Sequence, residues 1–232
     1  MKMTPNKQSQ TFRVMYAMRT ISLLSALCVA LSACSQKEEQ STTTPTAKKN
    51  VNLDSLQTAY FASGCFWCVE AIFESLDGVE EVVSGYSGGK EKNPTYEQVS
   101  AGLTGHAESV KIYYDSTKVS YQTLLEVFFG SHDPTTLNQQ GPDRGKQYRS
   151  AIFYKNTGEK AAAEKYIQEL LKAKTFSKIT TEVAPFSKFY EAEDYHQDYE
   201  RMNPDNSYVR AVSIPRLNKF KQKFPKLLKK KH

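Results

Sequence analysis

Two cysteines, Cys65 and Cys68, stand one helical turn apart in the segment Gly-Cys-Phe-Trp-Cys-Val-Glu at 64–70. An apolar, strand-like stretch precedes them, and Ser63-Gly64 ends it. Apolar residues then recur at the spacing of an amphipathic helix, at Val69, Ile72, Phe73 and Leu76. Cys65 should therefore lie at a helix N-terminus, where free backbone N–H groups and the helix dipole favour a thiolate. Cys68 lies at a separation that a disulfide can bridge.

Packing and metal binding are the alternatives to redox chemistry for these cysteines. A lone cysteine is most often a small buried hydrophobe. A redox function is favoured instead by a pair at this spacing that follows a glycine and begins a helix. A zinc site needs more ligands, but the histidines at 106, 132 and 196 are scattered and no second cysteine pair follows. We therefore expect no metal.

Glu108 is the second residue that could do chemistry. In the expected strand 106–114, alternation places Glu108 on the same face as Val110, Ile112 and Tyr114. A carboxyl group on an apolar face is either paired or has a raised pKa, and a raised pKa would let it donate a proton near neutral pH. A glutamate at a strand end that simply reaches water is an equally good interpretation of the pattern.

A polar loop and several tyrosines complete the candidate residues. The polar stretch 131–149 is longer than a plain connection requires, and ordered long loops often carry function. Tyr86, Tyr96 and Tyr148 stand near turn signals and could offer phenol donors. Ordinary aromatic packing is the alternative for each.

Strand and helix signals alternate along the segment that positions these residues. Strands are predicted at 79–86, 106–114, 150–154 and 179–184. Helices are predicted after Cys65, after a Ser120 cap, at 157–174 and at 193–202. This order predicts an α+β fold in which helices pack on a mixed sheet.

The N-terminal part of the chain reads as a targeting segment. Basic residues precede an apolar run at 21–31 that is short for a membrane span, so residues 1–33 predict a signal peptide. The run ends Leu-Ser-Ala-Cys, which resembles a bacterial lipobox and would make Cys34 a lipidated residue. An ordinary signal peptide with a chance cysteine is the alternative. We expect an exported lipoprotein, anchored in a membrane and facing the periplasm or the cell surface.

Composition predicts the bounds of the remaining segments and excludes one class of partner. Residues 34–58 are polar and predict a disordered tether, residues 59–215 predict one domain, and residues 216–232 form a basic tail. Residues 1–33 hold four basic and no acidic residues, so without them the net charge falls from +6 to +2. So small a positive charge is no argument for a nucleic-acid partner.

Six ordered segments resemble the methionine sulfoxide reductase A family. They are 64–70, Gly-Tyr-Ser-Gly-Gly at 85–89, Asn-Pro-Thr-Tyr at 93–96, Gly-His-Ala-Glu at 105–108, His-Asp-Pro-Thr at 132–135, and Gln-Tyr-Arg-Ser at 147–150. The resemblance implies a two-layer α/β sandwich with a ferredoxin-like core. It also implies reduction of the S epimer of methionine sulfoxide, protein-bound or free, by a protein that we expect to be a monomer.

The resemblance assigns roles residue by residue. Cys65 matches the nucleophile that attacks the sulfoxide sulfur. Phe66 and Trp67 match the pocket for the methyl group. Glu108 matches the acid that protonates the sulfoxide oxygen, helped by the phenols of Tyr96 and Tyr148. Asp143 matches an aspartate that acts through water or by positioning. The product would be methionine and a sulfenic acid on Cys65.

The chain departs from many family members because no cysteine follows Cys68. Cys68 is then the internal candidate to condense with the sulfenic acid, giving a Cys65–Cys68 disulfide. A thioredoxin-like protein outside the cytoplasm would reduce it, and no cofactor is needed. A thioredoxin-like thiol-disulfide oxidoreductase is the alternative enzyme, and a peptide-binding lipoprotein is the alternative without catalysis.

Overall fold

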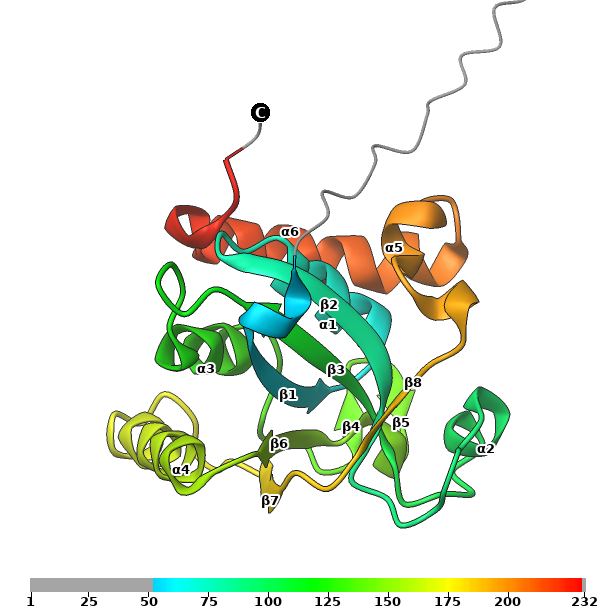
Figure 1. The fold of residues 1–232 in the computed structure, drawn as a ribbon, viewed down its shortest axis with the longest axis horizontal. Coiled ribbons are helices and arrows are strands. Elements are labelled where there is room, and N and C mark those ends of the chain that lie inside the picture. The colour runs from blue at the N-terminus through cyan, green and yellow to red at the C-terminus, as the bar shows by residue number, and fades with distance from the viewer. Residues whose placement is uncertain (1–51, 231–232) are drawn as a thin grey trace, which may run out of the picture. The chain divides into compact units, whose positions relative to one another are not determined.

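Six strands form one sheet, in the order β7-β6-β1-β3-β2-β8 (Figure 1). The structure, a computed structural model, describes residues 52–230. The strands of this sheet are β1 Gln57–Ser63, β2 Val79–Ser87, β3 Ala107–Tyr114, β6 Ser150–Tyr154, β7 Glu182–Pro185 and β8 Phe189–Glu191. Neighbouring strands are antiparallel except β6 and β7, which are parallel, so the sheet is mixed.

The helices differ widely in length. The longer ones are α1 Phe66–Glu74, α3 Tyr121–Gly130, α4 Thr157–Lys172 and α6 Ile214–Lys223. Two short helices are α2 Tyr96–Ser100 and α5 Tyr199–Met202, and a π-helical turn, Val209–Ser213, leads into α6. Single 3-10 turns lie at Leu53–Ser55, Lys146–Tyr148, Asp194–His196 and Pro225–Leu227.

The four central strands have the ferredoxin-like arrangement. Their order is β6-β1-β3-β2, and α1 and α3 connect β1 to β2 and β3 to β6. Strand β7 extends one edge and β8 the other. The predicted α+β fold with helices on a mixed sheet is therefore confirmed.

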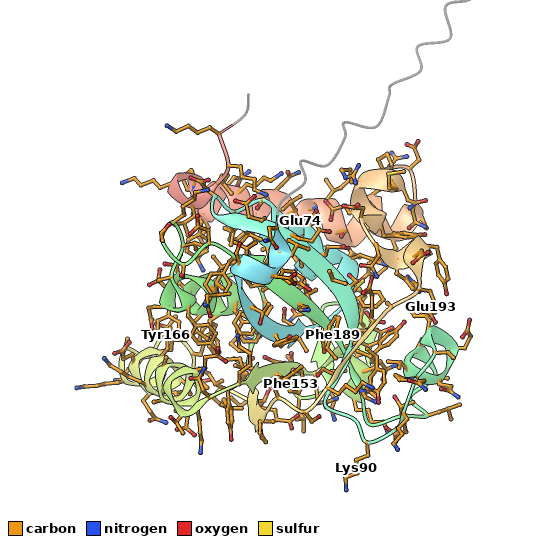
Figure 2. All side chains as sticks on the ribbon, in the orientation of Figure 1. Glu74, Lys90, Phe153, Tyr166, Phe189 and Glu193 are labelled. Atoms are coloured by element: carbon orange, nitrogen blue, oxygen red, sulfur yellow. The ribbon has the colours of Figure 1, made fainter. Side chains whose placement is uncertain are left out.

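Apolar side chains fill the space between the sheet and its helices. Phe61 on β1 and Ile112 on β3 face Phe73 of α1 and Phe128 of α3, and all four are fully buried. A smaller cluster covers the second face of the sheet, where Phe186 stacks on Tyr60 with ring centroids 3.9 Å apart. Phe153 and Phe189 belong to this second cluster (Figure 2). Both faces of the sheet are thus covered by apolar groups.

Local signals located most elements well. Ser120 caps α3, since its hydroxyl accepts a hydrogen bond from the Thr123 N–H at 3.0 Å. The helix predicted at 157–174 is α4, which ends at Lys172 and is capped by the Asn156 side chain. The strands predicted at 79–86, 106–114 and 150–154 are β2, β3 and β6.

The helix predicted at 193–202 is wrong, because contacts with the sheet interrupt it. The amide of Gln197 bonds both the N–H and the carbonyl of Ser84 on β2. Asp198 adopts a left-handed conformation (φ 55°), and its N–H donates to Glu70 Oε1 at 3.0 Å. The segment therefore forms a 3-10 turn before Gln197 and the short α5 after Asp198, because these two residues are held by contacts with β2 and α1.

Ordered structure extends beyond the predicted ends of the domain. The turn Leu53–Ser55 and the start of β1 lie in the segment predicted as a tether, 34–58. Beyond residue 215, Phe220 is only 2% exposed and belongs to the main core. Residues 216–228 therefore pack on the main core as part of the domain. Within residues 52–230, no helix is both long and apolar enough to span a membrane.

Candidate active site

The turn from β1 into α1 places Cys65 at the helix N-terminus, as predicted. Gly64 has φ +89°, and a Cβ there would lie 2.7 Å from the Gln140 side chain, so the turn requires glycine. Cys65 is the N-cap residue of α1 and is only 6% exposed. The nucleophile candidate is therefore nearly buried, at the edge of a pocket.

Glu108 lies beside this turn and is buried, which answers the question that the strand pattern left open. The carboxyl group is 2% exposed and accepts a hydrogen bond from the Phe66 N–H at 3.1 Å. The pKa of Glu108 is raised to about 8, mainly by burial, while the Phe66 N–H opposes the shift and the nearby Asp143 and Cys68 contribute to it. At neutral pH the group is therefore mostly protonated and able to donate.

The two cysteines form a hydrogen-bonded pair in which the pKa values of the two thiols shift in opposite directions. Burial raises the pKa of the Cys65 thiol, and Cys68 and Glu108 reinforce the shift. The hydrogen bond from Cys65 lowers the pKa of Cys68 to about 6, helped by the charge of Arg216 and the hydroxyl of Ser213. These directions favour the negative charge on Cys68 over Cys65, whereas the helix start alone favours a thiolate on Cys65. The largest cause is the burial of Cys65, which has little contact with water.

A pocket of about 290 Å³ brings the predicted residues together. Its wall includes every residue expected to act on the substrate: Cys65, Phe66, Trp67, Tyr96, Glu108, Asp143 and Tyr148. Three further residues line it from the segment before α6, at 206–208. Cys68 is 1% exposed and lies behind Cys65 rather than in this wall.

The aromatic wall of the pocket is held by the C-terminal segment. Trp67 stacks on Tyr199 with ring centroids 3.8 Å apart and an interplanar angle of 9°. Its indole N–H donates to His196 Nδ1 at 3.1 Å. The ring of Phe66 contacts His196 and Tyr96, with centroids 5.1 and 6.4 Å away. The indole is thus fixed by a stack and a hydrogen bond, and presents an apolar surface to the pocket.

The phenols in the pocket are neutral donors. Burial raises the pKa of Tyr96 to about 12 and also raises that of Tyr148, with Glu108 adding to both shifts. Asp143 accepts a hydrogen bond from the Tyr208 hydroxyl at 2.6 Å, and burial raises its pKa. Tyr86 points elsewhere, because its hydroxyl donates to Glu193, which also accepts the Tyr96 N–H.

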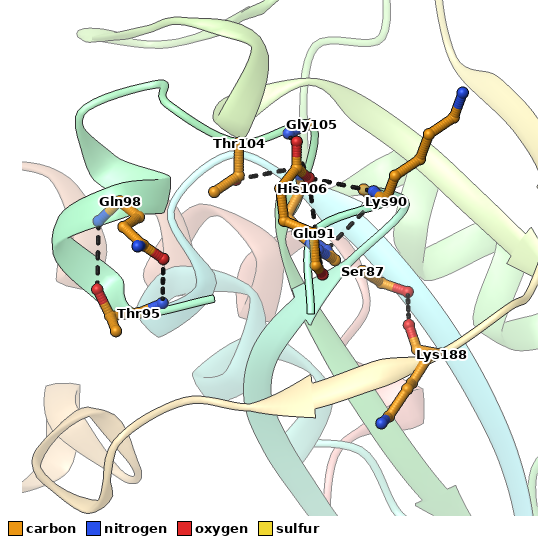
Figure 3. A network of polar contacts seen from close by, with 10 residues as sticks. Ser87, Lys90, Glu91, Thr95, Gln98, Thr104, Gly105, His106 and Lys188 are labelled. Atoms are coloured by element: carbon orange, nitrogen blue, oxygen red, sulfur yellow. Dashed lines mark hydrogen bonds and ion pairs between the residues drawn. The ribbon is translucent and has the colours of Figure 1, made fainter. Parts of the chain in front are cut away.

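The loop between β2 and β3 fixes α2, which carries Tyr96 (Figure 3). Thr95 and Gln98 form a reciprocal capping box at the start of α2. Glu91 accepts the Gly105 N–H at 3.0 Å, and the His106 ring bonds the Glu91 carbonyl at 2.9 Å. His106 therefore supports the loop.

Several residues of the site gave no sequence signal. His196, Tyr199 and Tyr208 lie in short or irregular elements without an apolar period, and Ser213 ends a π-helical turn. The contact of Ser213 with Cys68 spans 145 positions of sequence. Cys34 and the predicted signal peptide lie outside the described residues.

One group of carboxylates among the described residues could geometrically hold a cation. One ligand oxygen each of Glu70, Glu74 and Asp198 lies within 4.8 Å of the others. Burial raises the pKa of Glu70 to about 8, so one of the three is mostly uncharged at neutral pH. A neutral carboxyl group that already bonds Ser84 and the Asp198 N–H is a poor cation ligand.

Comparison with known proteins agrees with this geometry. The family model described as peptide methionine sulfoxide reductase matches residues 57–228. The chain belongs to this family. It is accordingly an oxidoreductase that reduces methionine sulfoxide, which favours this activity over thiol-disulfide exchange.

Curated peptide methionine sulfoxide reductases and several solved structures are similar to this chain over most of the domain. The Rhodopirellula baltica and Pasteurella multocida enzymes are each 51% identical, over 72% and 75% of this chain and 87% and 99% of their own. Reduced Mxr1 from Saccharomyces cerevisiae aligns with a TM-score of 0.61 and 34% identity, over 65% of this chain and 87% of its own. Methionine sulfoxide reductase A of Corynebacterium diphtheriae aligns with a TM-score of 0.59 and 36% identity, over 65% of this chain and 76% of its own.

Proposed function

We propose that this protein reduces the S epimer of methionine sulfoxide, both free and in oxidised proteins and peptides, with Cys65 as the nucleophile. The observation that carries the proposal is the meeting of a buried thiol, a protonated carboxyl group and an apolar wall in one pocket. A sulfoxide has a polar oxygen beside apolar substituents, so a site that reduces it needs a proton donor next to an apolar surface.

The first step transfers oxygen from substrate to Cys65. Cys65 gives its proton to the hydrogen-bonded sulfur of Cys68, and its thiolate attacks the sulfoxide sulfur. Glu108 donates its proton to the sulfoxide oxygen, because an unprotonated oxygen is a poor leaving group. The protonated oxygen then passes to Cys65: its bond to the substrate sulfur and the transient bond between the two sulfurs break, and a Cys65 S–O bond forms, which leaves methionine and a sulfenic acid. The substrate sulfur is reduced by two electrons and the Cys65 sulfur is oxidised by two.

The other pocket residues orient the substrate. The rings of Phe66 and Trp67 contact the methyl group, and the phenols of Tyr96 and Tyr148 hold the sulfoxide oxygen next to Glu108. Asp143 acts by position, since its carboxyl group fixes the hydroxyl of Tyr208.

Cys68 resolves the sulfenic acid. It attacks the oxidised Cys65 sulfur, the S–S bond forms, and the S–O oxygen leaves as water. A thioredoxin-like protein then reduces the Cys65–Cys68 disulfide, and no cofactor takes part. Support comes from the hydrogen bond between the two sulfurs and from the lack of any cysteine after Cys68.

Residues 1–33 act as a lipoprotein signal, and Cys34 carries the lipid that anchors the enzyme outside the cytoplasm. Support for this proposal comes from the Leu-Ser-Ala-Cys sequence after an apolar run. In a bacterial host, a Cys34→Ala chain should lose metabolic labelling with a fatty acid and leave the membrane fraction. Unchanged labelling and fractionation would refute the anchor.

The reaction is tested by turnover of racemic methionine sulfoxide with dithiothreitol, followed by chiral analysis of the remaining substrate. The wild-type domain should consume the S epimer alone, and Cys65→Ser should consume neither. Turnover of neither epimer by folded, reduced wild-type protein would exclude the proposal.

The recycling step needs a separate experiment with a thioredoxin-type reductant. Cys68→Ser should still produce one methionine per protein, but its steady-state turnover should fall. If Cys68→Ser turned over at the wild-type rate, direct reduction of the sulfenic acid by the partner would replace the disulfide step.

A further inference from the structure

Behind the nucleophile, three polar groups form a chain that leads away from the substrate pocket. The Ser213 hydroxyl lies 3.1 Å from Cys68 Sγ and 2.6 Å from Glu200 Oε2. Cys68 comes from α1, Ser213 from the π-helical turn and Glu200 from α5. Ser213 is fully buried and Cys68 is 1% exposed, so the hydroxyl is the link between the thiol and the carboxyl group.

A serine hydroxyl has one proton to donate, so two arrangements with a single negative charge satisfy all three groups. In one, the Cys68 thiol donates to Ser213, and Ser213 donates to the Glu200 carboxylate. In the other, a protonated Glu200 donates to Ser213, and Ser213 donates to the Cys68 thiolate. These arrangements differ only by a proton moved along the chain from sulfur to carboxyl group.

The far end of this chain reaches solvent. Glu200 is half-buried and lines an open pocket of about 370 Å³. This pocket shares only Trp67 with the lining of the substrate pocket. A proton that leaves Cys68 through Ser213 can therefore exit without crossing the space that the substrate occupies.

We infer that Ser213 and Glu200 form the proton path for Cys68 in the resolving step, an inference that rests on the proposed function. Cys68 holds the proton it received from Cys65, and Glu200, which no longer faces a thiolate across Ser213, has released its own proton to the second pocket and is a carboxylate. As its sulfur attacks the Cys65 sulfenic acid, the thiol proton moves to Ser213 and the Ser213 proton moves to the Glu200 carboxylate. The S–S bond forms and the S–O bond breaks. The departing hydroxide takes a proton from Glu108, which has been reprotonated from solvent, and leaves as water. Glu200 then releases its proton to the second pocket.

The charges around the path suit this exchange. Burial raises the pKa of Glu200 above its ordinary value, while Ser213, Lys221 and Arg216 oppose the shift. Cys68 faces the Cys65 thiol, the Arg216 guanidinium and Glu200 itself. The other ionisable groups that line the Glu200 pocket are Glu70, Glu74, Asp198 and Arg201.

The test is a single turnover of reduced protein with excess methionine sulfoxide and no reductant. Methionine, dimedone-trapped sulfenic acid and the Cys65–Cys68 disulfide are counted over time between pH 6 and 9. In wild type the disulfide should follow methionine closely. In Ser213→Ala, disulfide formation should slow at least about tenfold relative to methionine formation, so sulfenic acid accumulates. Ser213→Thr, which restores a hydroxyl, should recover the rate.

A second variant, Glu200→Gln, tests the other end of the path. Its amide oxygen can still accept the hydrogen bond from the Ser213 hydroxyl, but it cannot take the Ser213 proton. Disulfide formation should slow in this variant and lose the part of its pH dependence that Glu200 causes. Glu74→Gln removes a carboxylate from the same pocket and should keep the wild-type ratio and profile. Wild-type disulfide rates and pH profiles in Glu200→Gln would overturn the path, whether or not Ser213→Ala folds. Absence of methionine in wild type would instead overturn the proposed function.

Discussion

At the scale of single residues, the site depends on carboxyl groups whose environments set their protonation. Glu108 and Glu70 are both 2% exposed, and burial raises the pKa of each to about 8. Glu108 lines the substrate pocket, whereas Glu70 lies on the other side of α1, where it accepts bonds from Ser84 and the Asp198 N–H. The same physical effect therefore supplies an acid in one place and a structural contact in the other.

The activity should depend on protonated Glu108. Its carboxylate form cannot donate, so kcat/KM should fall as pH rises through about 8. Glu108→Gln should lower kcat/KM at pH 7 by at least about 100-fold and remove this alkaline fall. Initial rates between pH 6 and 9.5 provide the measurement. Glu70→Gln is the matched control and should keep the alkaline fall, and the same fall in Glu108→Gln would contradict the assignment.

Stability should decrease as the solution becomes alkaline, because the folded protein holds protons that the unfolded chain releases. For Glu70, the free energy of unfolding should decline as pH rises from the ordinary value of 4.5 toward about 8, by about 1.4 kcal/mol per pH unit within that window. Glu70→Gln should flatten this decline. Urea unfolding at pH 5, 7 and 9 measures it, and parallel declines in both proteins would exclude Glu70 as a source.

At the scale of elements, α6 and the turn before it complete the site that α1 begins. Arg216 donates to the carbonyls of Ser63 and Ser131, which joins α6 to the end of β1 and the end of α3. Ser213 contacts Cys68, and Phe220 enters the main core. In Figure 1, α6 passes along α1. The basic segment predicted as a tail thus contributes to both core and site.

Shortening the buried side chain of α6 should destabilise the whole domain. Phe220→Ala should lower the free energy of unfolding by about 3–5 kcal/mol, since it leaves a cavity in the core. Lys219→Ala, at an exposed position of the same helix, should change it by less than about 0.5 kcal/mol. Urea unfolding of both proteins measures the difference. A small effect of Phe220→Ala would mean that α6 is not part of the cooperative unit.

At the scale of the whole molecule, the substrate pocket, both apolar clusters and the proposed proton path lie within residues 52–230. A chain that begins at Asn52 should therefore keep the urea midpoint and the kcat/KM of a chain that begins at Ser35. Both soluble proteins can be compared directly in unfolding and turnover assays. A clear loss in the shorter chain would show that residues 35–51 contribute to the fold or the site.

The sequence by itself determined the features that depend on local pattern. Helical spacing after Cys65 located this cysteine at a helix start, and strand alternation placed Glu108 on the face that meets the helices. These predictions succeed because side-chain direction follows from the period of the element alone. The resemblance added Tyr96, Tyr148 and Asp143, which line the same pocket.

Only the tertiary structure decided the features that depend on contacts between distant segments. It favoured a thiolate on Cys68 over one on Cys65, because burial raises the pKa of Cys65 and opposes the effect of the helix N-terminus. It broke the helix predicted at 193–202 through bonds from Gln197 and Asp198 to residues more than 100 positions away. Long-range contacts also bring Ser213, Tyr208 and His196 to the site. Desolvation and long-range hydrogen bonds are properties of the packed molecule, so no local pattern encodes them.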